Sequence, residues 1–179
     1  QMVRTGFRLD SGDVAADLFT LQGNFYQGHQ DWLYAEPIAS APYLSTLTDE
    51  ELVRGANLLG RWTHAFADDS QLIWQTYFDH TDRESNLPRE RRNTFDTDLQ
   101  HHFAPIGCHN LVAGLGYRLT ADDIENNFAN QFLPDQRTLE LFSAFVQDEM
   151  MVVEDRLRFT LGTKLEHNDF TGFEYQPSG

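Results

Sequence analysis

A strict alternation of polar and apolar side chains over residues 156–167 constrains this chain more than any other feature of its sequence. The odd positions are mostly large and apolar, and they include Leu157, Phe159, Leu161 and Leu165. The even positions are charged or small: Arg156, Arg158, Thr160, Gly162, Lys164 and Glu166. A period of two residues is typical of a β-strand with two unlike faces, and a glycine at this place would weaken a helix. The segment is therefore predicted to be a strand.

The same period recurs along most of the chain. In 92–103 the even positions are wholly polar, whereas Phe95, Leu99 and Phe103 occupy odd positions. Residues 71–79 and 18–26 alternate in the same way. Further strands are expected at 3–10, 56–66, 109–119 and 138–148. The sequence therefore predicts an all-β fold, an antiparallel up-and-down meander of about eight strands, as part of a transmembrane β-barrel.

The segment 138–148 leaves the orientation of its faces open. Phe142, Ala144 and Val146 form an apolar set, with Ser143, Gln147 and Glu149 on the other side. Phe145, however, falls among the polar positions. Which face of this strand is the apolar one is not decided by the pattern alone.

Short and long connections take turns along the chain. Short ones are expected near Ser11–Ala16, Ala67–Ser70, Ala104–Gly107 and Met151–Asp155, and long ones over Gly28–Gly55, Thr81–Arg91 and Ala121–Arg137. A meander built this way has its tight turns at one end and its long loops at the other, which is the layout of an outer-membrane barrel. Capping-type spacings predict two short helices inside the long loops, at 48–55 and 120–128.

The composition and the motifs exclude several classes of function. A net charge of −15 argues against a nucleic-acid partner, because phosphates require a basic surface. No known catalytic motif is present, so we expect no enzymatic activity, no catalytic residues and no cofactor. His101 and His102 are adjacent and would point to opposite faces of a strand, so no metal site is expected there. Asp96 and Asp98 share a face, but a solvated wall explains them better than catalysis.

One face of the predicted strands is too polar for the core of an ordinary domain. In water, the opposite apolar face would have to pack on a second layer. In a membrane it could face lipid, while the polar face lines a wet lumen. Aromatic residues near the expected strand ends fit interfacial girdles: Trp62, Phe66, Tyr77, Phe103 and Tyr117. A soluble all-β ligand-binding module, such as a lectin-like sandwich, remains the alternative.

Residues 141–170 resemble the barrel of TonB-dependent outer-membrane receptors. The run "SAFVQDE" at Ser143–Glu149 is followed, after a short turn, by the pattern L-x-x-T-x-G-x-[KR]-x-[DE] at Leu157–Glu166. Residues 91–103 and 19–28 are similar to other strands of such barrels. The similarity is scattered over nearly the whole chain and is most specific in 141–170.

The resemblance implies an outer-membrane receptor for the uptake of a metal chelate such as a siderophore, haem or cobalamin. Such receptors pair a plug with a barrel of about 22 strands, and an energy-transducing periplasmic protein drives their transport. About eight strands would make residues 1–179 a partial barrel domain without the plug and the remaining strands. The resemblance places the parent protein in the outer membrane of a Gram-negative bacterium, in contact with lipid.

Ligand-binding residues are expected in the long loops, because function in such barrels lies at the open end. Five residues are the candidates: Trp32, Tyr34, Arg83, Arg89 and Arg91. Aromatic and guanidinium groups suit anionic or catecholate ligands. An open sheet of this size also leaves two unpaired edges and an uncovered apolar face. The isolated fragment is therefore expected to form a small closed barrel or sandwich, or to pair with a second copy.

Overall fold

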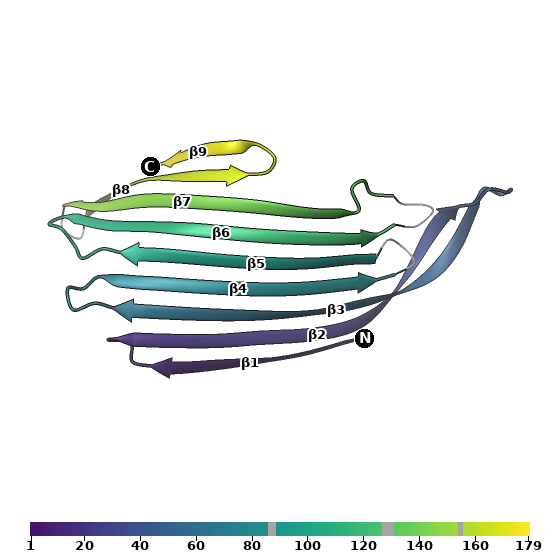
Figure 1. Cartoon of the computed structure of the whole chain (residues 1–179), viewed down its shortest axis with the longest axis horizontal. Coiled ribbons are helices and arrows are strands. Elements are labelled where there is room, and N and C mark those ends of the chain that lie inside the picture. Colours follow the sequence, from purple (N-terminus) through teal and green to yellow (C-terminus); the bar gives the residue numbers. More distant parts are fainter. Residues whose placement is uncertain (86–88, 127–130, 154–155) are drawn as a thin grey trace.

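The strands of this protein lie side by side in the order in which they occur in the sequence (Figure 1). The computed structural model describes residues 1–85, 89–126, 131–153 and 156–179. Its strands are β1 (Met2–Gly12), β2 (Asp17–Pro37), β3 (Leu44–Ala65), β4 (Gln71–Glu84), β5 (Arg89–His102), β6 (His109–Glu125), β7 (Gln136–Val153), β8 (Leu157–Asn168) and β9 (Gly172–Ser178). All pairings are antiparallel, which confirms the predicted all-β meander and adds β9 to it.

Connections between successive strands lie at alternate ends of the sheet, as the sequence predicts. The turns that follow β1, β3 and β5 lie at one end, called here the short-turn end (Figure 1). The connections that follow β2, β4 and β6 lie at the other, the long-hairpin end. Over the described residues there is no helix long and apolar enough to cross a membrane.

The long connections are shorter than expected because the strands continue into them. The loop predicted over Gly28–Gly55 is wrong: β2 runs on to Pro37 and β3 begins at Leu44. The helix predicted at 48–55 is also wrong, since these residues pair with β2 as part of β3. The helix predicted at 120–128 is wrong for residues 120–125, which belong to β6. Residues 127 and 128 lie outside the described residues.

The register places the predicted apolar residues of neighbouring strands opposite one another. Trp62 of β3 pairs with Trp74 of β4, which pairs with Leu99 of β5, which in turn pairs with Leu115 of β6. Directly opposed residues share a face of a sheet. These residues therefore define one side of the sheet, the apolar face, and the alternate residues define the polar face.

The same register settles the orientation of β7. Phe142 pairs with Tyr117, and Ala144 pairs with Leu115, so both lie on the apolar face. Phe145 lies on the polar face opposite Gly114, where its ring occupies the space that a Cβ atom of residue 114 would need. Covering a strand glycine with a cross-strand ring is a known way to stabilise a sheet, which explains an aromatic residue at a polar position.

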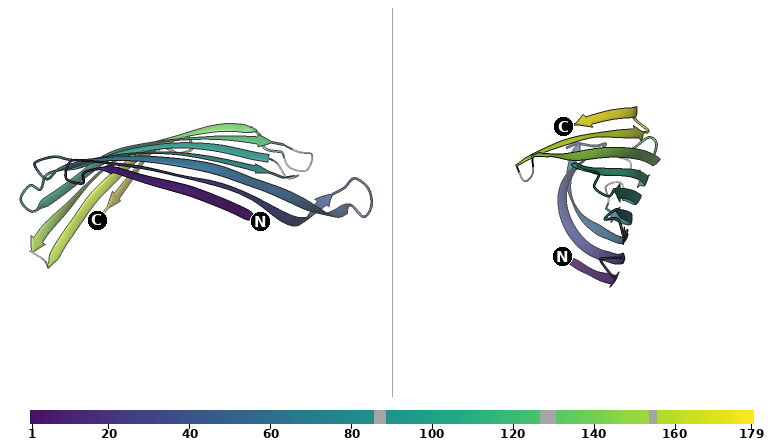
Figure 2. Two further views of the ribbon diagram at one scale, coloured as in Figure 1. Left: turned by 90° about the horizontal axis from the view of Figure 1, so that it is seen from below. Right: turned by 90° about the vertical axis from the view of Figure 1, so that its left-hand side faces the viewer.

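No hydrophobic side chain among the described residues is buried. Leu58, in the middle of β3, is 46% exposed. The sheet is strongly curved (Figure 2), yet β1 and β9 each pair with one neighbour and no second layer covers the described strands. The small closed barrel or sandwich considered for the fragment is therefore not formed, and the apolar face remains without a protein cover.

Candidate functional site

The polar face carries a wall of paired charges over β4, β5 and β6. Arg118 donates from Nε to Asp96 Oδ2 at 2.8 Å, and Arg92 donates from Nε to Asp122 Oδ1 at 2.5 Å. A shallow hollow of about 260 Å³ lies between these ion pairs. Its lining is Tyr77, Asp79, Arg92, Thr94, Asp96, Arg118 and Thr120. The hollow presents cationic hydrogen-bond donors from its arginines and anionic acceptors from its aspartates, and both can contact a polar group.

A second polar contact on this face joins the long-hairpin ends of three strands. Glu51 of β3, which is 7% exposed, accepts a hydrogen bond from Trp32 Nε1 of β2 at 2.7 Å. The other oxygen of Glu51 lies 2.9 Å from Nε of Arg83 in β4. Both oxygens of this nearly buried carboxylate thus have a partner, one an indole N–H and the other a guanidinium. The contact fixes β2 and β3 against β4.

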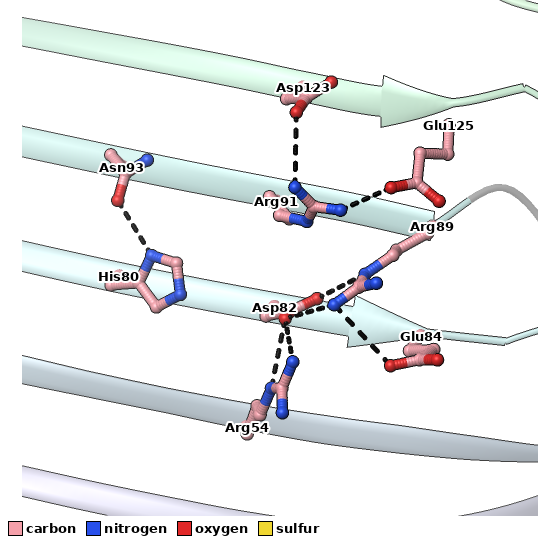
Figure 3. A network of polar contacts seen from close by, with 9 residues as sticks. All are labelled: Arg54, His80, Asp82, Glu84, Arg89, Arg91, Asn93, Asp123 and Glu125. Carbon is pink, nitrogen blue, oxygen red and sulfur yellow. Dashed lines mark hydrogen bonds and ion pairs between the residues drawn. The ribbon is translucent and has the colours of Figure 1, made fainter.

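The apolar face has a charged cluster at its long-hairpin end (Figure 3). At its centre Asp82 is 4% exposed and lies 2.6 Å from Nη2 of Arg54 and 2.8 Å from Nη2 of Arg89. Arg89 donates to both oxygens of the Asp82 carboxylate, from Nε at 3.0 Å and from Nη2 at 2.8 Å. The other members are Glu84, Arg91, Asp123 and Glu125, with Arg91 paired to both Asp123 and Glu125.

The opposite, short-turn end of the apolar face carries an aromatic belt. Its members are Phe19, Trp62, His64, Phe66, His101 and Phe103. Successive ring centroids lie between 4.4 and 6.3 Å apart. Polar atoms of the belt are satisfied by Asp17, which accepts from Trp62 Nε1 at 2.8 Å and lies 2.8 Å from His64 Nδ1. The apolar face is therefore bounded by charges at one end and by mixed aromatic and polar groups at the other.

Two of the aromatic residues expected at strand ends do not belong to this belt. Tyr77 lies on the polar face, where its hydroxyl donates to Asp79 at 3.0 Å. Tyr117 lies on the apolar face against Phe142, with ring centroids 4.6 Å apart. Trp62, Phe66 and Phe103 thus lie together near strand ends on the apolar face, whereas alternation places the ring of Tyr77 on the polar face, where it cannot belong to the same girdle.

Comparisons with known proteins support the fold. Neither a scan of protein-family models nor a search of curated proteins finds a match. Among solved structures, the chain is similar to the siderophore receptor PirA from Pseudomonas aeruginosa, with a TM-score of 0.65 and 10% sequence identity. The likeness covers 98% of this chain and 35% of that receptor. What the two share is the fold: this antiparallel sheet corresponds to a part of that structure.

The structure separates the five residues predicted to bind a ligand. Trp32 and Arg83 come together on the polar face through Glu51. Arg89 and Arg91 lie on the apolar face in the charged cluster. Tyr34 belongs to β2 opposite Leu47, but its side chain lies outside the described part of the structure. Of the five candidates, only Trp32 and Arg83 are therefore brought together, at the long-hairpin end of the polar face.

The adjacent histidines point to opposite faces, as predicted. His101 stacks on Phe103 in the aromatic belt, whereas His102 pairs with Gln71 on the polar face. Within the described residues, no three His, Cys, Asp or Glu side chains gather in a way that could hold a metal ion. Asp96 pairs with Arg118, whose Nε lies 2.8 Å from Asp96 Oδ2.

Sequence reasoning missed the two nearly buried carboxylates that organise the charges. Asp82 occupies an even position of β4, in line with Leu72, Trp74 and Phe78. An acidic residue in line with apolar ones is the signal that could have identified it. Glu51 gives no such signal, because the capping-type spacing around it predicts a short helix in a loop.

Proposed function

We propose that this chain forms part of the wall of an outer-membrane, TonB-dependent receptor that takes up a metal chelate such as a siderophore, haem or cobalamin. The apolar face contacts lipid and the polar face lines the interior. The proposal assigns the chain no catalytic step and no cofactor. A plug and an energy-transducing periplasmic protein are the partners of the parent receptor.

The observation that carries the proposal is the exposed apolar face of a single-layer sheet. A soluble β-sandwich buries this face against a second sheet, and no such layer covers the described strands. Charged groups of the polar face, by contrast, have partners within the chain, as in the ion pair Arg118–Asp96. Lipid on one side and water on the other satisfy both faces at once.

The height of the apolar face fits a bilayer. On β3 this face runs from Arg54 in the charged cluster to His64 in the aromatic belt. About ten residue steps at about 3.4 Å each span roughly 34 Å along the strand. With a strand tilt of about 40°, the corresponding height is roughly 26 Å, close to the apolar band of about 25 Å on outer-membrane barrels.

Two observations support the receptor role within this class. The fold is similar to a piece of a siderophore receptor. In addition, Trp32 and Arg83 lie together at the long-hairpin end of the polar face, where a ligand entering the barrel from outside would first meet the wall.

Site-directed spin labelling tests the assignment of the two faces. In a Cys108→Ser background, nitroxides are placed at residues 58 and 78 of the apolar face, and at residues 57 and 77 of the polar face. The full chain is reconstituted in lipid bilayers. We expect labels at 58 and 78 to be relaxed preferentially by oxygen, and labels at 57 and 77 by a water-soluble nickel chelate.

The neighbouring positions serve as matched controls, since each pair differs by one residue along the same strand. Equal access of the nickel chelate to both faces would contradict a lipid-facing side. A chain that stays monomeric in water without detergent and binds glycans would support the lectin-like module instead.

Ligand uptake is tested in the parent receptor that contains this segment. We expect Arg83→Ala to weaken the binding of an anionic ferric chelate by about tenfold, because a guanidinium interacts strongly with such ligands. Arg91→Ala is the control, since Arg91 lies on the apolar face. Equal effects of the two substitutions would argue against a ligand contact at Arg83.

A further inference from the structure

Two strands reach beyond the rest of the sheet at the long-hairpin end (Figure 1). Pairing of β2 with β3 continues from Gln30–Glu51 to Pro37–Leu44, whereas β4 begins to pair with β3 at Leu52. Residues 30–50 are called the protruding ribbon. Within the described residues, no strand pairs with the outer edge of β3 over 44–50. Such an edge presents unpaired backbone donors and acceptors and is a template for an added strand.

The protruding ribbon is rich in exposed apolar side chains. Leu33 is 74% exposed and Leu44 is 55% exposed. The two lie on the same face, because Leu33 pairs with Thr48 and Leu44 pairs with Pro37, an even number of positions (four) further along each strand. A two-stranded ribbon is at best marginally stable by itself. A partner that covers the exposed apolar groups would remove their surface from water and stabilise the ribbon.

The charge of the ribbon determines what kind of partner fits. Residues 30–50 contain four carboxylates and no lysine or arginine. Asp31 lies directly opposite Glu50, and like charges in that position destabilise a ribbon. The nearby titratable group is His29, whose Nδ1 lies 3.2 Å from Glu50 Oε1. Positive charge from outside would relieve this repulsion.

The base of the ribbon is held in place by the contact already described on the polar face. Glu51 joins Trp32 of the ribbon to Arg83 of β4. Because both bonds use one nearly buried carboxylate, the ribbon is anchored at its root while its outer part projects from the sheet (Figure 1). The free edge of the ribbon is therefore accessible to a partner and is not packed against the rest of the described chain.

We propose that the protruding ribbon is a docking site for a basic, partly apolar polypeptide segment of another protein, which adds as a strand to the β3 edge at residues 44–50. A second copy of this chain is disfavoured because two acidic ribbons repel each other. Anionic lipid headgroups and anionic chelates are disfavoured for the same reason. The docking site goes beyond the uptake proposal and does not depend on it.

A designed peptide tests the docking site. The full chain in micelles of an uncharged detergent is titrated into a fluorescent peptide of alternating lysine and valine, with a glutamate–valine peptide as comparison. We expect the basic peptide alone to bind, with an affinity that falls as salt is added. Hydrogen exchange should show new protection of backbone amides at 44–50, which marks strand addition.

Two double variants separate the contributions of apolar contact and charge. Leu33→Ser with Leu44→Ser removes exposed apolar groups, and Asp31→Asn with Glu50→Gln removes ribbon charges. Each is expected to weaken peptide binding by about tenfold or more. Glu149→Gln with Glu174→Gln is the matched control: it changes the net charge equally, away from the ribbon, and should leave binding unchanged.

Several outcomes would overturn the docking site. Equal affinity for the acidic peptide would remove the charge argument. An equal loss in the Glu149/Glu174 control would reduce the effect to overall charge. Binding without protection at 44–50 would exclude strand addition, and ribbon-dependent binding to neutral phosphatidylcholine vesicles would assign the surface to lipid. Circular dichroism of each variant establishes that the sheet is intact.

Discussion

Asn57 and Leu58 are neighbours on β3, yet they meet different surroundings. On the polar face, Asn57 accepts a hydrogen bond from Asn24 at 3.2 Å. On the apolar face, Leu58 is exposed and lies opposite Phe78. The polar face is satisfied by partners within the chain, whereas the apolar face depends on what surrounds it. One backbone therefore serves two environments, with a single residue step between them.

Charges follow the same division. On the polar face, cations such as Arg92, Arg118 and Lys164 are spread over several strands and paired with nearby acids. On the apolar face of the described strands, the arginines are confined to the charged cluster: Arg54, Arg89 and Arg91. Arginines thus occur on the apolar face only at its long-hairpin end, whereas the carboxylates Glu140 and Asp148 of β7 also lie on this face.

The largest difference between the faces is expected for a charge placed in their middle. Leu58→Arg should lower the free energy of unfolding in lipid by about 2–4 kcal/mol, the cost of an arginine at the midplane on a lipid-facing position. Asn57→Arg should cost about 1 kcal/mol, the loss of one hydrogen bond. Urea titration of tryptophan fluorescence in bilayers measures both. Equal costs would erase the distinction between the faces.

Breaking the charged cluster is expected to have a somewhat smaller effect. Asp82→Asn should cost about 1.5–3 kcal/mol, because two guanidinium groups lose their shared anion in a nearly buried place. Glu149→Gln is the control on the polar face, where Arg158 lies 3.4 Å away and exposed, and should cost less than about 1 kcal/mol. The same urea titration ranks the pair. A reversed order would indicate that the polar face carries the stronger electrostatic contribution.

The smallest of the three destabilising effects is expected for a glycine substitution. Gly114→Ala should cost about 1–3 kcal/mol, because the new methyl group overlaps the Phe145 ring on the polar face. Gly60→Ala on the apolar face should be nearly neutral, since nothing lies within 4 Å of its Cβ position. Thermal unfolding followed by circular dichroism is the measurement. A neutral Gly114→Ala would mean that the ring moves aside freely.

Alternation predicted the strands well only where the two faces differ. Residues 92–103 and 156–167 alternate because large apolar groups are confined to one side, and 71–79 follows the same pattern with Ile73 and Tyr77 on its more polar side. In the protruding ribbon that contrast is lost: Trp32 lies on one face and Leu33 on the other, and Asp31 and Glu50 share the face of Leu33. Without a consistent apolar side, a strand has no period-two signal, so the sequence predicts a loop there.

The candidate site was predicted in part for the same reason. Arg89 and Arg91 were treated as loop residues, for which odd and even positions have no meaning. Once β5 is seen to begin at Arg89, both fall in line with Phe95 and Leu99 on the apolar face. The contact of Trp32 with Arg83 through Glu51 could not be predicted, because it depends on the register between β2, β3 and β4.

Each strand pairs only with its neighbours in sequence. A hairpin of two strands can therefore be added to the sheet or removed from it as a unit. Inserting or deleting two consecutive strands would leave the other registers untouched and return the chain to the same end, with the same side outward. The loss of a single strand would instead reverse the direction of everything that follows. Insertions or deletions of two strands at a time can therefore widen or narrow such a sheet while the pairing of the remaining strands stays the same.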